Sequence, residues 1–392
     1  MRLTLSSLAA ALLAAATVSP AALAQGTGGP IKVGLMLPNS GTFAGLGTAI
    51  ENGFKLYVQE QGGKLGGREV QYFKVDDESE PSKATDNVNK LIKRDGVDVL
   101  VGTVHSGVAL AMAKAARENN VLMVIPNAGA DSITGALCSA GVVRSSFSNW
   151  QPGYAMGIVA GQKGVKRAMT VTWNYAAGTE SVKGFAEGLE KGGGKVIKDL
   201  NLPFPGVEFQ ALLTEIAAQK PDAVYSFFAG GGAVKFVKDY AAAGLNKTIP
   251  LYGPGFLTDG TLEAQGASAQ GMLTTLHYAD DLNTPRNNTF RKAYAIAYKA
   301  QPDVYSVQGY DAAQILAAGL KAVDGDLSAG KRDALTTAMH KTVVDSPRGK
   351  FALSAAGNPI QDMYLREVKG NNNEFRSIAV KALADPARGC KL

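Results

Sequence analysis

Two short apolar runs separated by a helical pattern constrain the fold of this chain more than any other stretch. Residues 97–101 and 121–125 are rich in β-branched side chains, and each run gives way to small polar residues. Residues 108–119, between them, have apolar side chains at helical spacing. A strand, a helix and a second strand in this order form a βαβ unit with parallel strands. We therefore expect α/β sheets flanked by helices.

The loops after these two strands carry the first candidate binding groups. The first loop contains His105 and Ser106, and the second reads Asn127-Ala128-Gly129. Because the carboxyl ends of parallel strands meet at one edge of a sheet, both loops would face the same ligand. A serine hydroxyl, free backbone N–H groups and a helix amino terminus suit a small anion, most simply a carboxylate.

The amino terminus has the pattern of a secretory signal. Arg2 supplies a positive charge, residues 8–18 form an apolar segment, and Ala22-Leu23-Ala24 is a small-x-small cleavage site. The apolar segment is too short to span a bilayer comfortably. We expect residues 1–24 to be removed, the mature chain to begin near Gln25, and the protein to be soluble in the periplasm.

Length, charge and cysteine content narrow the possibilities further. About 368 of the 392 residues would remain after cleavage, which exceeds the size of a single core and predicts two domains. The formal net charge of +6 is spread along the chain, so nucleic acid is not an expected partner. The only two cysteines, Cys138 and Cys390, would most simply form one disulfide in an oxidising compartment. Two free thiols are the alternative.

Strands and helices alternate along most of the chain. Strands are expected at residues 31–37, 69–75, 168–173, 195–200, 223–228 and 250–252. A first helix is expected to follow the turn at residues 38–41 and to end at about Gln61, and further helices are expected at residues 81–94, 179–191, 209–219 and 233–243. Two such runs, on either side of residues 144–152, predict two similar lobes with mostly parallel sheets. The helical patterns at 285–299 and 306–323 cannot be assigned to a lobe from periodicity.

Motifs of catalysis are missing from the sequence. The three histidines, His105, His277 and His340, are far apart, and neither a His-Glu-x-x-His helix nor a Gly-x-Ser-x-Gly turn occurs. The glycines at 192–194 lack the spacing of a phosphate loop. Asp76-Asp77-Glu78 is more simply a solvated turn than a cation site. We expect no enzyme activity, no cofactor and no metal, and the pattern favours a binding protein.

Several different short motifs follow one another along the chain: Pro38-x-Ser40-Gly41-x-Phe43-Ala44-x-x-Gly47, Val101-Gly102 with Ser106, Pro126-x-Ala128, Gly178 with Gly184-Phe185, Gly244-Leu245, Gly309-Tyr310-Asp311-Ala312 and Gly349-x-Phe351. By these motifs, residues 31–368 resemble the leucine/isoleucine/valine-binding proteins of ABC importers, a class of type I periplasmic binding proteins. The resemblance implies two α/β lobes joined by a three-crossing hinge. It implies a first lobe of residues 25–146 plus about 279–345, and a second of 147–278 plus about 346–392.

The resemblance also implies ligand positions. It assigns the family's carboxylate-binding serine to Ser106 and its backbone groups to residues 127–129, although the family often has threonine where Gly129 stands. In the second lobe the family's tyrosine corresponds to Ala177, and a second aromatic position falls at about residues 229–230.

The largest departure from the family pattern is Gly255, which stands where amino-acid binders carry an acid for the α-ammonium. A buried ammonium without that partner loses about 2–5 kcal/mol, so Gly255→Glu should improve amino-acid binding. Small residues at Ala177 and Gly230 would enlarge the cleft. Aromatic side chains that could stack on a ring lie near the same strand ends: Trp173, Tyr175, Phe227, Phe228 and Phe256. The expected ligand is an aromatic carboxylate without an essential amine.

Other ligands and roles stay open at this point. An aliphatic branched-chain amino acid would need ammonium contacts from Tyr175 or Asp280, and an amide or urea-like solute is a further alternative. The resemblance implies a monomer that closes on its ligand and docks on membrane permease subunits driven by cytoplasmic ATPases. A ligand-sensing periplasmic role would use the same binding event.

Overall fold

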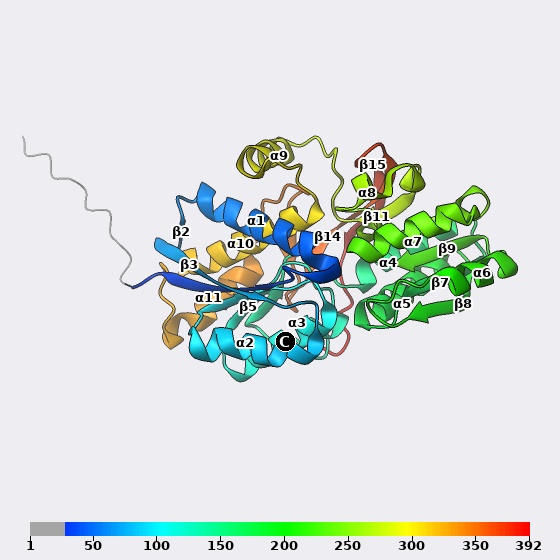
Figure 1. Ribbon diagram of the computed structural model, residues 1–392. Coiled ribbons are helices and arrows are strands. Elements are labelled where there is room, and N and C mark those ends of the chain that lie inside the picture. Colours follow the sequence, from blue (N-terminus) through cyan, green and yellow to red (C-terminus); the bar gives the residue numbers. More distant parts are fainter. Residues whose placement is uncertain (1–27) are drawn as a thin grey trace, which may run out of the picture.

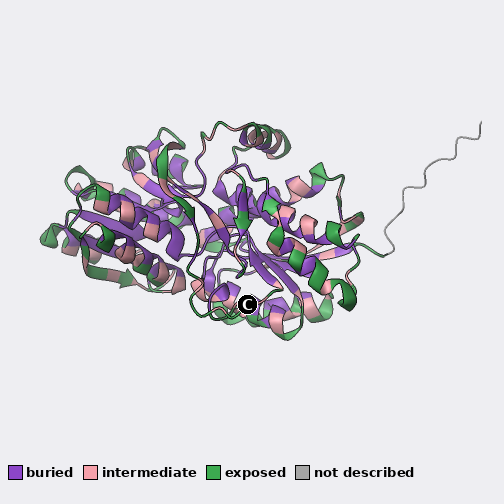
Figure 2. Cartoon of the chain, turned by 180° about the vertical axis from the view of Figure 1, so that it is seen from behind, coloured by how far each residue is buried: buried purple, intermediate pink, exposed green. Residues whose placement is uncertain are grey.

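The computed structural model describes residues 28–392 and divides them between two α/β lobes that lie side by side (Figure 1). The predicted signal at residues 1–24 and the start near Gln25 lie outside the described residues. Buried residues concentrate in the strands at the centre of each lobe, whereas the helices are buried on one side and exposed on the other (Figure 2). Among residues 28–392, no helix combines the length and the apolar character needed to cross a bilayer.

The first lobe contains a six-stranded sheet with the order β2-β3-β1-β4-β5-β6. Its strands are β1 (Ile31–Leu37), β2 (Lys64–Leu65), β3 (Arg68–Asp76), β4 (Val99–Val101), β5 (Leu122–Ile125) and β6 (Val142–Arg144). All pairs except β2–β3 are parallel. The residues of β4 and β5 are entirely buried, as expected of central parallel strands covered on both faces.

Helices cover both faces of this sheet. They are α1 (Ala44–Glu60), α2 (Pro81–Asn89), α3 (Ser106–Glu118), α10 (Val304–Ala322) and α11 (Arg332–Lys341). The two late helices return to the first lobe because Leu316 and Leu335 pack with Val33 and Val124 in one apolar core. Helix α9 (Pro285–Tyr298) lies outside α1 and contacts it.

The second lobe is built on a nine-stranded sheet. Its strands are β7 (Arg167–Trp173), β8 (Lys195–Leu202), β9 (Ala223–Phe227), β10 (Leu251–Pro254), β11 (Leu273–Leu276), β12 (Val343–Val344), β13 (Phe351–Leu353), β14 (Pro359–Lys369) and β15 (Asn372–Leu383). The pairs among β7 to β11 are parallel, whereas β14 pairs antiparallel with both β11 and β15. The accompanying helices are α4 (Trp150–Gln162), α5 (Ala176–Lys191), α6 (Gln210–Gln219), α7 (Gly230–Ala242) and α8 (Leu262–Gln265). The predicted fold class of two mostly parallel α/β lobes is confirmed.

Residues 145–149, residues 277–281 and β14 pass between the lobes. Arg348 ties two of them together, since its guanidinium donates to the carbonyls of Ser145 and Ser146 and to Gln361 Oε1 on β14. It also pairs with the buried Asp311 of α10 at 3.0 Å. Gln361 on β14 also donates to the Ser146 carbonyl, at 2.7 Å. The predicted lobe division at residues 345–346 stays a prediction; Phe351, just beyond it, packs in the first lobe's core.

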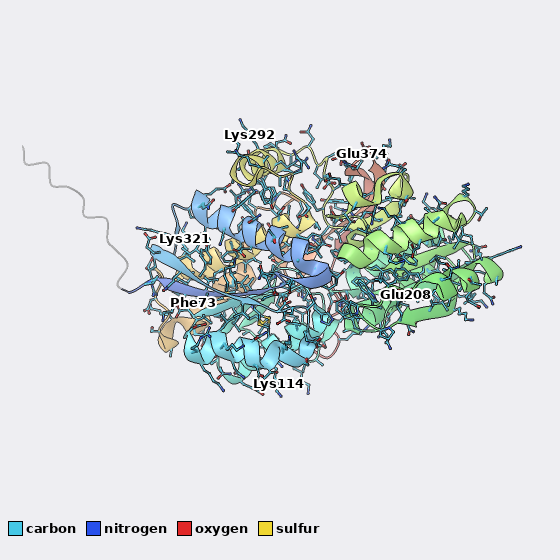
Figure 3. The ribbon with its side chains drawn as sticks, in the orientation of Figure 1. Phe73, Lys114, Glu208, Lys292, Lys321 and Glu374 are labelled. Atoms are coloured by element: carbon cyan, nitrogen blue, oxygen red, sulfur yellow. A yellow bond between two sulfur atoms is a disulfide. The ribbon has the colours of Figure 1, made fainter. Side chains whose placement is uncertain are left out.

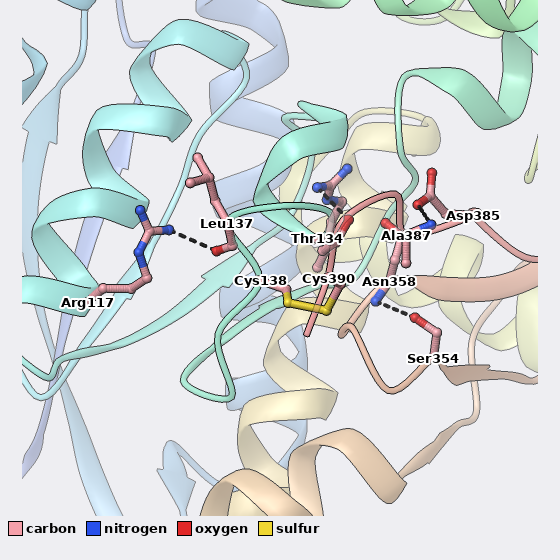
Figure 4. The surroundings of a disulfide bond; sticks show 10 residues. Arg117, Thr134, Leu137, Cys138, Ser354, Asn358, Asp385, Ala387 and Cys390 are labelled. Carbon is pink, nitrogen blue, oxygen red and sulfur yellow. Dashed lines mark hydrogen bonds between the residues drawn. A yellow bond between two sulfur atoms is a disulfide. The ribbon is translucent and has the colours of Figure 1, made fainter. Parts of the chain in front are cut away.

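A disulfide ties the carboxy-terminal tail to the first lobe, as the cysteine content predicted. Cys138 and Cys390 are bonded with an S–S distance of 2.09 Å, across 252 residues of sequence (Figure 4). The tail reaches this point after β15, and Asp385 in it accepts a hydrogen bond from the Ala387 N–H at 2.7 Å.

Replacing both Cys138 and Cys390 with serine should lower the free energy of unfolding by about 2–5 kcal/mol, because the bond restricts a long loop in the unfolded chain. Guanidinium denaturation would measure the change. Wild-type protein treated with a reductant should show the same loss as the double variant. Equal stability of oxidised wild type and double variant would contradict the prediction.

Candidate ligand-binding site

The carboxyl ends of the parallel strands in both lobes face one another across a small cavity. Ligands of open α/β sheets bind at such strand ends. The cavity is lined by residues from both lobes: Phe43, Leu46, Val104, Ser106, Asn127, Gly129, Phe147, Asn149, Tyr175, Ala177, Phe227, Ala229, Phe256 and Tyr305. Six of the predicted ligand residues are among them: Ser106, Asn127, Gly129, Tyr175, Ala177 and Phe256.

Ser106 lies at the first residue of α3, where the helix amino terminus meets the cavity. His105 caps this helix, because its Nδ1 accepts a hydrogen bond from the Gly107 N–H at 3.0 Å. The Ser106 Oγ accepts a hydrogen bond from Asn149 Nδ2 at 3.3 Å. Its own hydroxyl hydrogen can therefore point at a ligand, and the positive end of the helix dipole favours an anionic one.

The loop after β5 contributes Asn127 and Gly129 to the wall, but Ala128 does not line the cavity. Asn127 Nδ2 donates to Gln308 Oε1 at 2.7 Å, and the Ala128 N–H donates to the Thr103 carbonyl at 2.9 Å. A Cβ at Gly129 would lie only 2.4 Å from Asn149 Oδ1. This close approach requires glycine, which gives a physical reason for the missing threonine of the family pattern.

Aromatic rings make up most of the remaining wall. The six lining rings are those of Phe43, Phe147, Tyr175, Phe227, Phe256 and Tyr305. The Phe147 and Phe256 rings have centroids 4.6 Å apart with a tilt of 36°, and Phe256 lies 6.1 Å from Tyr305. The Tyr305 hydroxyl is buried and has no hydrogen-bond partner among the described residues. The distances between these ring centroids are typical of tilted and edge-to-face aromatic contacts, so the wall suits a flat ring.

Three predicted residues lie behind the wall. Trp173 is fully buried, and its indole N–H donates to the Gly206 carbonyl at 2.8 Å. His105 stacks on Tyr175 with centroids 4.7 Å apart, and burial lowers the pKa of this histidine to about 4, so its ring is neutral near pH 7. Gly230 contacts Thr42 of the first lobe, as described below.

Gly255 also lies outside the wall, for a reason that the sequence could not reveal. A Cβ at Gly255 would lie 2.1 Å from Arg366 Nη2. Arg366 is buried, pairs with Asp259 at 2.7 Å and donates to the Tyr278 carbonyl at 2.9 Å, so it cannot easily move away. A glutamate at 255 would meet this guanidinium rather than a ligand. The geometry contradicts the expectation that Gly255→Glu would improve amino-acid binding.

No acidic or basic side chain lines the cavity within residues 28–392. Lys114, Lys292 and Glu374, by contrast, lie on the outside of the molecule (Figure 3). An α-ammonium in this cavity would have no carboxylate partner, whereas a carboxylate would meet the Ser106 hydroxyl. The Gly129 N–H, which makes no hydrogen bond in the described part of the chain, is a second available donor.

Sequence reasoning missed several wall residues, among them Phe147, Asn149 and Tyr305. Phe147 and Asn149 lie on the first passage between the lobes, where no strand or helix pattern marks them. Tyr305 lies only four residues before the Gly309 motif, so its position relative to that motif was the one available signal.

Comparison with known proteins gives three concordant results. The family described as periplasmic binding protein matches residues 30–373. A Leu/Ile/Val-binding protein homolog of Brucella melitensis is 32% identical over 345 residues, which cover 86% of this chain and 87% of the relative. An ABC-transporter solute-binding protein from R. palustris, solved in complex with benzoate, is 55% identical with a TM-score of 0.90, covering 93% of this chain and all of that one.

A second solute-binding protein, from Rhodopseudomonas palustris BisB5, was solved in complex with 3,4-dihydroxybenzoic acid. It is 30% identical with a TM-score of 0.85, and the alignment covers 91% of this chain and 99% of that one.

Proposed function

The chain belongs to the periplasmic binding protein family and is a solute-binding protein of the ABC-transporter class; we propose that its solute is an aromatic carboxylate, with benzoate as the simplest case. Proteins of this family bind solutes and are not enzymes. The observation that carries the proposal is the cavity wall, which combines six aromatic rings with the Ser106 hydroxyl and contains no charged side chain.

In the proposed pose the ligand carboxylate accepts two hydrogen bonds. One comes from the Ser106 hydroxyl at the amino terminus of α3, and the other comes from the Gly129 N–H in the loop after β5. The ligand ring then lies among Phe147, Tyr175 and Phe256, where each aromatic contact adds about 0.5–1.5 kcal/mol beyond area burial. An amino acid would bury its ammonium without a counter-charge, which typically costs about 2–5 kcal/mol. The two structural relatives that hold benzoate and dihydroxybenzoate support this choice.

Ligand capture is proposed to close the lobes, because only the closed form touches a ligand from both sides. Phe43 of the first lobe meets Trp173 of the second with ring centroids 6.1 Å apart. A Cβ at Gly230, whose φ is +56°, would lie 2.1 Å from the Thr42 carbonyl oxygen. Closure therefore depends on the absence of a side chain at position 230.

We further infer that residues 1–24 direct export to the periplasm, where the protein works as a monomer and delivers its ligand to membrane permease subunits coupled to cytoplasmic ATPases. The family membership supports this inference. Mass spectrometry of the exported protein should place its amino terminus near Gln25.

A thermal-shift panel on refolded, ligand-stripped protein should show stabilisation by benzoate and hydroxybenzoates and none by leucine, isoleucine or valine. A ligand at 100 times its dissociation constant adds about 2.7 kcal/mol of stability, which is readily visible. Stabilisation by leucine alone would overturn the proposed ligand class and favour the function for which the Brucella relative is named.

Ser106→Ala should weaken benzoate binding about 5- to 150-fold, because a buried carboxylate oxygen then lacks its donor. Isothermal titration calorimetry would measure the change. Ser82→Ala is the matched control, since Ser82 lies in the first turn of α2 and is exposed, away from the cavity. Unchanged affinity in Ser106→Ala would contradict the proposed pose.

Gly230→Ala should weaken benzoate binding by about 5- to 150-fold, because the new methyl group meets the Thr42 carbonyl only when the lobes close. Gly244→Ala is the control, since Gly244 has a φ of +72° but its Cβ would meet nothing within 4 Å. Both variants should lose about 1–2 kcal/mol of stability from the left-handed backbone. Equal ligand affinities in the two variants would contradict the closure argument.

A further inference from the structure

Glu180, on α5 of the second lobe, is hydrogen-bonded to the cavity wall although it does not line the cavity. Its Oε2 accepts hydrogen bonds from Asn149 Nδ2 at 2.7 Å and from the backbone N–H of Asp131, in the first lobe, at 3.0 Å. The same Asn149 Nδ2 donates to Ser106 Oγ at 3.3 Å. Glu180 is therefore connected through one amide group to the hydroxyl proposed to hold the ligand carboxylate.

This arrangement fixes the direction of each hydrogen bond. An ionised carboxylate only accepts hydrogen bonds, so Asn149 must present its amide nitrogen, and not its oxygen, to Glu180. The second hydrogen of that nitrogen donates to Ser106 Oγ. Because a serine hydroxyl has a single hydrogen, the hydrogen of Ser106 remains available for an acceptor in the cavity.

The charges around Glu180 are consistent with its accepting role. Asp131, Asp385 and the buried guanidinium of Arg144 face it, and Arg388 lies near Asp131. Burial, together with the Glu180 and Asp385 charges, raises the pKa of Asp131. Burial also raises the pKa of Glu180, but its two N–H donors and Arg144 oppose that rise. The two N–H groups that Glu180 Oε2 accepts favour its ionised form.

We propose that Glu180 is a positioning residue that orients Asn149 and thereby keeps Ser106 as a hydrogen-bond donor, so that the site selects a carboxylate over a neutral amide. This inference rests on the proposed function, because it requires the ligand head group to lie against Ser106. It assigns selectivity to a residue outside the cavity wall.

The sharpest variant is Glu180→Gln, which keeps the size of the side chain but adds a donor. The glutamine amide can donate to Asn149 Oδ1, which lets Asn149 turn over and accept the Ser106 hydrogen. Affinity for benzoate should fall about tenfold or more, as expected for the loss of a hydrogen bond to a charged group. Affinity for benzamide, the neutral analogue, should change much less, so the benzoate-to-benzamide ratio measured by calorimetry should fall. An unchanged ratio would overturn the inference.

A double-variant cycle separates positioning from general damage. If Glu180 acts through Ser106, adding Glu180→Gln to Ser106→Ala should cause almost no further loss of benzoate affinity. Equal losses in the two backgrounds would overturn the inference. Glu187→Gln is the matched control, since Glu187 lies two turns further along α5 and accepts from Trp150 Nε1 at 2.7 Å. It removes the same charge and should leave the ratio unchanged.

The experiment also distinguishes this inference from the proposed function. Wild-type protein that binds neither benzoate nor benzamide would refute the proposed function itself. Wild type that binds benzoate, with a Glu180→Gln variant of unchanged selectivity, would refute only the role of Glu180. If Glu180→Gln does not fold, Glu180→Ala removes the acceptor of Asn149 Nδ2, so Asn149 can turn over and accept the Ser106 hydrogen, and the same fall in the ratio is expected.

Discussion

Helices from both lobes begin at the cavity between them, and the character of the site depends on this convergence. Ser106, Tyr175, Ala229 and Tyr305 line the cavity, and each lies within two residues of the start of α3, α5, α7 or α10. The first three helices start there because each follows the carboxyl end of a parallel strand. The arrangement surrounds the cavity with helix amino termini, whose partial positive charges favour an anion. A carboxylate can thus be held in a wall that has no basic side chain.

Selectivity between carboxylates and amino acids depends on the side chains that the site has no room for as well as on the hydrogen-bond donors that it contains. The space beside Gly255 is filled by Arg366, which is buried and paired with Asp259. Breaking such a pair would leave a buried charge uncompensated, so the position is closed to an acidic side chain that could pair with a ligand ammonium. Gly129 is similarly restricted by Asn149 Oδ1. At both positions a neighbouring polar side chain occupies the space that a larger residue would need. Neither position can therefore supply a side chain that would pair with an amine.

The sequence predicted what depends on local pattern and missed what depends on contacts between distant segments. Strand β1 was predicted with its observed bounds, and the βαβ unit that carries Ser106 and Gly129 follows from apolar runs that are buried on both faces. The long strands β14 and β15 were missed, although buried and less buried residues alternate along β14. Trp173 was placed in the site because it ends a strand, but neighbouring residues at a strand end point to opposite faces. Phe43 and Phe147 enter the wall only because the two lobes meet.

The contacts that join the lobes directly also influence affinity, because a ligand has to supply only the free energy that closure still lacks. The His105–Tyr175 stack and the Phe43–Trp173 contact link the two lobes directly. Each raises the fraction of closed molecules, and apparent affinity scales with the fraction that is competent to bind. The same contacts must stay weak enough for the lobes to reopen. Affinity is therefore set jointly by the cavity wall and by residues such as His105 and Gly230, which do not line the cavity but determine how readily the lobes close.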